Sequence, residues 1–145
     1  MRTIISFVLF LFVMEVAQAH SYRFGNLEIV HPTIMVPPAN SDCTCAHVTI
    51  TNHGSKTEYF LSAAIAIASN TRLLHVAGLD EDISAPSSVP IPPGTKLELG
   101  RHEWCLFLSN ISKNLEADVG VYPARLIFRY AGAIDIEFMV DSPHH

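Results

Sequence analysis

The feature that most constrains the fold is a series of short alternating or β-branched apolar runs divided by turn-forming residues. Alternation of this kind is typical of half-buried strands. The dividing residues are Pro37-Pro38-Ala39-Asn40, Asn52-His53-Gly54, Pro92-Pro93-Gly94 and Ala131-Gly132. The predicted strands are Asn26–Val30, Thr44–Thr51, Thr57–Ala64, Thr71–Val76, Thr95–Leu99, Glu103–Leu108, Ala124–Tyr130 and Ala133–Val140. Short strands at this spacing predict an all-β sandwich or barrel.

The same alternation predicts which side chains face the core. The expected core residues are Val48, Ile50, Leu74, Leu97, Leu106, Leu108, Leu126 and Phe128. Because successive side chains of a strand point to opposite faces, Cys105 and Phe107 are expected to lie opposite Trp104, Leu106 and Leu108. The Pro/Ser-rich stretch Ala85–Pro93 is predicted to be a loop within the domain.

The first segment is predicted to be a secretory signal peptide, residues 1–19. Arg2 supplies the positive charge, and the apolar run Ile4–Met14 is too short to span a bilayer. Ala17-Gln18-Ala19 is a small-x-small cleavage site, so the mature chain is expected to begin at His20. One domain, residues 20–140, then follows, with 141–145 as a loose tail and no membrane span after cleavage.

Composition narrows the classes of function. Apolar residues make up 49% of the 145 residues and charged residues 16%, which argues against general disorder. The net charge of −5 argues against a nucleic-acid partner, which would need a basic face. Gly-x-Ser-x-Gly, His-Glu-x-x-His and glycine-rich phosphate loops do not occur in the sequence, so no enzyme is predicted. Three cysteines and eight histidines raise the hypothesis of a metal site.

Several short motifs resemble those of a known family in order and spacing. They are His20-Ser21-Tyr22 with Gly25–Ile29 and His31-Pro32, Val48–Gly54, Leu74-His75, Ile91–Leu99, Leu115–Asp118, and Ala124–Tyr130 with Ala131-Gly132. Together they resemble the periplasmic copper chaperones called PCu(A)C, almost end to end in the mature chain. The resemblance implies a cupredoxin-like Greek-key β-sandwich in the periplasm. It also implies delivery of copper to a respiratory oxidase subunit or to another copper carrier.

The copper ligands of that family are only partly matched. The family holds Cu(I) with two histidines and two methionines, because soft thioethers suit this ion. His75 matches the first histidine, but no methionine lies between Met35 and Met139, so the first methionine ligand is missing. A gapless alignment puts Cys105 at the second histidine and Phe107 at the second methionine, whereas a shift of three residues would put His102 there. The resemblance therefore implies an altered ligand set.

The first candidate site pairs Cys105 with His75, a thiolate and an imidazole that could hold Cu(I). Two other interpretations of Cys105 stay open: a buried cysteine acting as a small hydrophobe, and a disulfide to Cys43 or Cys45.

The second candidate is Cys43, Cys45 and His47, which alternate along one predicted strand and so share a face. Soft sulfur ligands there would suit Cu(I) or zinc, although a single disulfide to Cys105 with one spare thiol is the alternative. The third is His20, whose freed α-amine and ring would together chelate Cu(II). A copper carrier with an altered site is the leading hypothesis, and a metal-free β-sandwich binding module is the rival.

Overall fold

The computed structural model describes residues 21–77, 82–100, 103–112, 115 and 120–141. The predicted signal peptide, His20 and residues 142–145 of the predicted tail lie outside this range. The described residues form strands and turns, and they include no helix that is long and apolar enough to cross a membrane.

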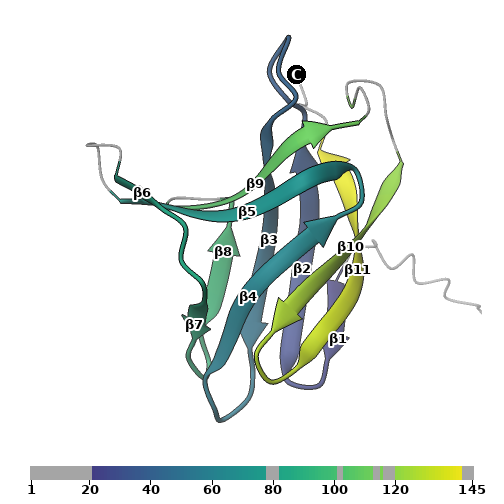
Figure 1. Cartoon of the computed structure of the whole chain (residues 1–145). Helices are drawn as coiled ribbons and strands as arrows, with labels where there is room; N and C mark the ends of the chain where they lie inside the picture. Colours follow the sequence, from purple (N-terminus) through teal and green to yellow (C-terminus); the bar gives the residue numbers. More distant parts are fainter. Residues whose placement is uncertain (1–20, 78–81, 101–102, 113–114, 116–119, 142–145) are drawn as a thin grey trace, which may run out of the picture.

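The described residues form eleven strands, whose arrangement is shown in Figure 1. They are β1 (Ser21–Phe24), β2 (Leu27–Met35), β3 (Thr44–Asn52), β4 (Glu58–Ile65), β5 (Ala68–Ala77), β6 (Asp82–Ser84), β7 (Val89–Ile91), β8 (Lys96–Leu99), β9 (Trp104–Ile111), β10 (Val121–Phe128) and β11 (Gly132–Asp141). The pairing order is β6-β5-β9-β3-β2-β11-β10-β4-β7, with β1 added to β2 and β8 added to β3. The prediction of an all-β fold is confirmed.

Strand β3 organises one half of this curled sheet. It pairs with β2 on one side, and on the other side with β9 at its start and with β8 at its end. The last strand, β11, returns to lie parallel to β2, whereas the other pairs are antiparallel. Strands β2, β3 and β9 therefore lie side by side, although β9 is far from β2 and β3 in the sequence, as Figure 1 shows.

One core cluster lies between the two halves of the sheet. It contains every predicted core residue except Leu74. The buried side chain on β5 is Leu73, which pairs with Leu106, while Leu74 is half-buried and pairs with Cys105. The predicted parity of β5 was therefore wrong. Because consecutive side chains point to opposite faces, an error of one residue exchanges the faces of the whole strand.

Three strands were not predicted: β1, β6 and β7. Strand β7 lies inside the Pro/Ser-rich stretch that was predicted to be a loop, and its central residue is Pro90, opposite Tyr59. Proline donates no ladder hydrogen bond, which suits the edge position that β7 occupies. The prolines of this stretch favoured a loop, so the sequence did not predict this strand.

A buried carboxylate holds the β10–β11 turn against β4. Glu58 is only 7% exposed, and its two oxygens accept hydrogen bonds from the backbone N–H groups of Tyr59, Tyr130 and Ala131. These bonds satisfy a charged group that would otherwise be costly to bury. Glu58 is thus a structural residue of this end of the sandwich.

Candidate metal centre

The predicted cysteine and histidine ligands of β3 lie on the outer face of the sheet. Along β3, Cys45 and His47 are half-buried, while Ala46, Val48 and Ile50 belong to the core. This alternation confirms the predicted orientation of the strand. A pair of β3 ligand candidates therefore lies where a soluble ion could reach them.

The neighbouring strand β9 has the parity that the sequence predicted. Leu106 and Leu108 are fully buried, whereas Cys105 and Phe107 are half-buried on the outer face. Cys45 lies directly opposite Phe107 in the ladder, so Cys105 lies on a diagonal from Cys45. The two cysteines are neighbours on one surface.

These two cysteines form a disulfide, with their Cα atoms 5.6 Å apart. The pairing that the sequence left open is thus Cys45 with Cys105, and Cys43 keeps a free thiol. In this oxidised form neither bonded sulfur is a thiolate, the form of cysteine that binds metals. The interpretation of one disulfide plus one spare thiol describes the structure.

His75 and Cys105 do not come together. In the β5–β9 ladder His75 pairs with Trp104, whereas Cys105 pairs with Leu74. His75 therefore projects from the face opposite to Cys105. Its Nε2 lies 2.7 Å from Oε2 of Glu103, and its ring centroid lies 4.4 Å from that of Trp104. The expected Cys105–His75 pair is absent from the described structure because of strand parity.

The other members of the predicted Cys43, Cys45 and His47 group have separate contacts. The Cys43 Sγ donates to the Asp42 carboxylate at 3.3 Å, and this hydrogen bond is the main reason that the pKa of the thiol is raised. The ring of His47 lies against Gly100, where an added Cβ would overlap it. The group shares a face as predicted, but Cys45 is bonded to Cys105.

A fourth sulfur lies beside the disulfide, and no pattern in the sequence pointed to it. Thr33 pairs with His47 and Ile34 with Ala46, so continuing this register brings Met35 opposite Cys45. Met35 is 37% exposed, on the outer face. It reaches this face because a bulge in β2 includes His31, whose φ is 53°, and shifts the alternation by one residue.

Among the described residues, no group of three or more histidines, cysteines, aspartates or glutamates is arranged to hold a metal ion. Met35 of β2 is a further candidate ligand, because thioethers bind soft metals. The sulfur atoms of Cys45, Cys105 and Met35 lie on one face of three adjacent strands. We refer to these three residues as the sulfur face.

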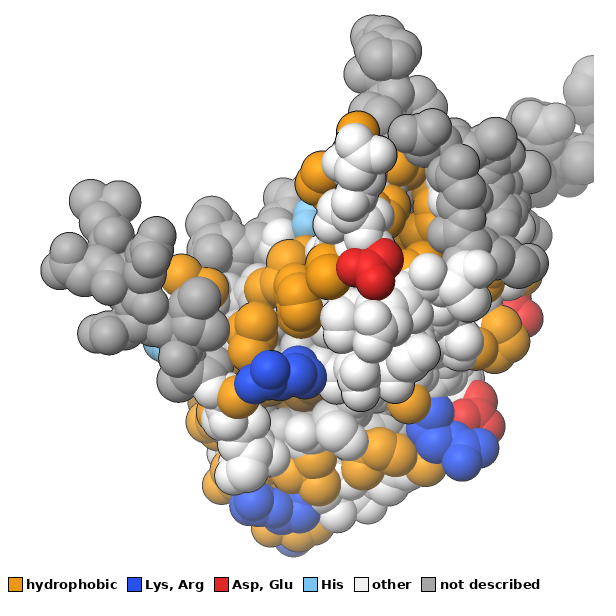
Figure 2. All heavy atoms as spheres, turned by 45° about the horizontal axis from the view of Figure 1, so that its top comes forward, with side chains coloured by type: hydrophobic (Ala, Val, Ile, Leu, Met, Phe, Trp, Pro, Cys, Tyr) orange, Lys and Arg blue, Asp and Glu red, His pale blue; other side chains and the backbone are white. Residues whose placement is uncertain are grey.

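A surface hollow of about 620 Å³ adjoins the sulfur face. Its lining includes His31, Thr33 and His47 from β2 and β3, and Lys96 and Glu98 from β8. Figure 2 shows one face of the molecule, on which charged side chains are few and many hydrophobic side chains are exposed. The hollow reaches His47, two residues along β3 from Cys45, but none of the three residues of the sulfur face lines it.

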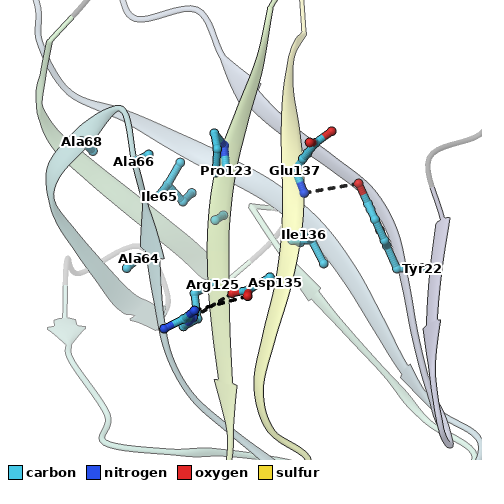
Figure 3. A pocket seen from close by; sticks show the side chains of 11 residues that line it. Tyr22, Ala64, Ile65, Ala66, Ala68, Pro123, Arg125, Asp135, Ile136 and Glu137 are labelled. Carbon is cyan, nitrogen blue, oxygen red and sulfur yellow. Dashed lines mark hydrogen bonds and ion pairs between the residues drawn. The ribbon is translucent and has the colours of Figure 1, made fainter.

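A larger groove of about 890 Å³ lies on β4, β10 and β11, and Figure 3 shows it from close by. Arg125 of β10 and Asp135 of β11 are direct neighbours in its lining and form an ion pair at 2.7 Å. The Tyr22 hydroxyl accepts a hydrogen bond from the backbone N–H of Glu137. Its lining contains no cysteine, histidine or methionine. The groove therefore offers no ligand for a soft metal.

Comparison with known proteins identifies the fold. No family model and no curated protein sequence matches this chain. Among solved structures, the copper-bound PCuAC domain of PmoF2 superposes with a TM-score of 0.70 at 21% identity, over 86% of this chain and 99% of that domain. The fold of this chain is the PCuAC fold.

Two further solved structures agree with this fold. The apo PCuAC domain of PmoF1 has a TM-score of 0.72 at 23% identity, over 86% of this chain and 100% of that domain. Cu(I)-bound DR1885 from Deinococcus radiodurans has a TM-score of 0.64 at 18% identity, over 87% of this chain and 83% of that one. The PCuAC fold thus includes copper-loaded domains, and here it carries a disulfide on its outer face.

Proposed function

We propose that this chain is a non-enzymatic copper carrier of the periplasm, exported through a cleaved signal peptide and using an altered ligand set. It would deliver copper to an acceptor such as a respiratory oxidase subunit, or exchange it with another copper carrier. Ligand exchange at an exposed face moves the ion without any chemistry on an organic substrate.

The observation that carries the proposal is the PCuAC fold, shared with domains that hold copper, together with Cys105 on its strand β9. Sulfur ligands favour Cu(I), and the family resemblance implies a histidine ligand at this position. The absence of a matching methionine ligand between Met35 and Met139 favours a set in which cysteine takes part.

The test is competitive titration of Cu(I) into reduced mature protein against a chromophoric Cu(I) chelator. We expect binding of copper that weakens as the pH falls, because protons compete for thiolate and imidazole ligands. Absence of Cu(I) binding by folded, reduced protein would favour the rival, a metal-free β-sandwich binding module. Metal analysis of protein purified from the periplasm would test the same point in the cell.

The Cu(I) affinities of the variants Cys105→Ser and His75→Ala distinguish between the possible ligand sets. Loss of affinity in both would support a site shared by these two residues, which would require β5 or β9 to rearrange. Loss in Cys105→Ser alone would support a site on the outer face. Unchanged affinity in both would leave Cys43, Cys45 and His47 and, for Cu(II), the N-terminal His20 as candidate ligands.

A further inference from the structure

The sulfur face combines three potential soft ligands from different parts of the chain. Extending the β2–β3 register by one pair places Cys45 between Met35 on β2 and Phe107 on β9, and Cys105 lies two residues from Phe107 on the same face of β9. Adjacent strands are about 4.8 Å apart, so side chains in neighbouring positions can reach a common ion. All three residues are at least partly exposed.

We infer that the sulfur face is a Cu(I) site that is closed by the Cys45–Cys105 disulfide and opens when that disulfide is reduced. The ligands are the thiolates of Cys45 and Cys105 and the thioether of Met35. This inference rests on the proposed copper function, and it specifies both the ligands and the control of binding.

The opening step is a thiol–disulfide exchange. A dithiol reductant attacks one sulfur of the Cys45–Cys105 bond, the other sulfur leaves as a thiolate, and the second thiol of the reductant resolves the mixed disulfide. Two electrons and two protons pass to this chain, and the reductant becomes a disulfide. Binding of Cu(I) then forms three copper–sulfur bonds, two to the thiolates and one to the Met35 thioether, and releases the two thiol protons.

The surroundings suit the product of this step. A Cu(I) ion with two thiolates carries a net charge of −1. Arg72 of β5 pairs with Phe107 of β9 and is exposed on the same outer face. Its positive charge would stabilise the complex, and the aromatic side chain of Phe107 would limit the access of water.

The alternative donors on this face are less suitable. The Cys43 thiol is engaged with its neighbour, because it donates a hydrogen bond to the Asp42 carboxylate at 3.3 Å. The ring of His47 packs on Gly100. Met139 pairs with Thr33 across β11 and β2, which leaves β2 between Met139 and the cysteines of β3 and β9. Met35 is therefore the third ligand.

The experiment compares Cu(I) affinity in the two redox forms of the mature protein. Ascorbate under anaerobic conditions keeps copper as Cu(I) while leaving protein disulfides intact, and a phosphine reductant opens them in a parallel sample. A bidentate chromophoric chelator competes for the ion, and thiol counts confirm the redox form. We expect the reduced form to bind at least about 100-fold more tightly, the upper end of the effect seen for residues that only support metal ligands. Equal affinity in both forms would overturn the inference.

A matched pair of variants tests the third ligand without touching the disulfide. In the reduced form, Met35→Leu should weaken Cu(I) binding by about tenfold, whereas Met139→Leu should leave it unchanged. Both replace a methionine by a side chain of similar size, so folding is preserved and circular dichroism checks it. Equal effects of the two variants would remove Met35 from the site.

The outcomes separate this inference from the proposed function. If reduced protein binds Cu(I) but Cys45→Ser retains full affinity, the sulfur face is refuted and the copper function stands. If folded protein binds no Cu(I) in either redox form, both are refuted.

Discussion

At the scale of single residues, one glycine shapes the surroundings of the candidate site. Gly100 follows β8 with a φ of +86°, and its N–H donates to the carbonyl oxygen of Trp104. An added Cβ would overlap the His47 ring and come 2.6 Å from the carbonyl oxygen of Ala46. Gly100 can therefore lie this close to β3 only because it has no side chain.

We predict that Gly100→Ala lowers the free energy of unfolding by about 2–4 kcal/mol, from left-handed backbone strain plus the clash with Ala46. Gly94→Ala is the matched control, because Gly94 also has a positive φ, of +72°, but open space around its Cα. That variant should lose only about 1–2 kcal/mol. Urea denaturation measures both, and equal losses would show that the close approach at Gly100 has no energetic weight.

The N-terminal residue gives a second prediction at this scale. If cleavage follows Ala19, the mature chain begins at His20, and its α-amine and imidazole should bind Cu(II) as a chelate. Intact mass and N-terminal sequencing of the exported protein check the cleavage point. Acetylation of the N-terminus should abolish this Cu(II) binding, and a mature chain that starts elsewhere would rule out the chelate.

At the scale of secondary-structure elements, β5 and β9 show how parity divides structure from candidate function. Leu106 is fully buried and Leu73 beside it is buried too, whereas Cys105 and Leu74 pair on the outer face. The inner residues hold the sandwich together by burial of apolar surface. The outer residues are available for a ligand or a disulfide.

We predict that Leu106→Ala costs about 2–5 kcal/mol of unfolding free energy, because a fully buried leucine leaves a cavity. Leu74→Ala, the same chemical change on the neighbouring strand, should cost clearly less because Leu74 is half-buried. Chemical denaturation of both variants makes the comparison. A larger loss for Leu74→Ala would reverse the assignment of faces in β5.

At the scale of the whole molecule, the disulfide links β3 to β9 across 60 residues of sequence. The enclosed segment includes β4 to β8, five of the eleven strands of the described residues. A crosslink over a segment of this length reduces the conformational freedom of the unfolded chain. Reduction of the disulfide should therefore lower the free energy of unfolding. It should also provide the two thiolates of the proposed copper site.

We predict that Cys45→Ser/Cys105→Ser lowers the stability of the oxidised protein by about 2–4 kcal/mol. The same variant should match wild type when both are measured in reductant, because the crosslink is then absent from both. Cys43→Ser should change little in either condition, since Cys43 has a free thiol. A stability difference that persists in reductant would mean that packing of the cysteines, and not the crosslink, supports the fold.

Local alternation in the sequence was enough to predict the β class, most strand positions and most of the core. It also predicted the outer face shared by Cys45 and His47 and the faces of β9, because the period of two holds within a regular strand. The structural role of Glu58 was not predicted, because its hydrogen bonds to a turn far away in the sequence leave no local sequence pattern. The resemblance to PCu(A)C pointed to the fold that the structural comparison then found.

Only the tertiary structure decided which of these faces meet. Sequence parity cannot say which strands pair or in what register. The prediction of a Cys105–His75 pair came from the ligand positions of the resembled family, and the two residues lie on opposite faces. The bulge at His31 shifts the alternation within β2 and turns Met35 to the outer face. Strand order then brings Cys45, Cys105 and Met35 together, because pairing between distant segments is a property of the packed sheet and not of any one strand.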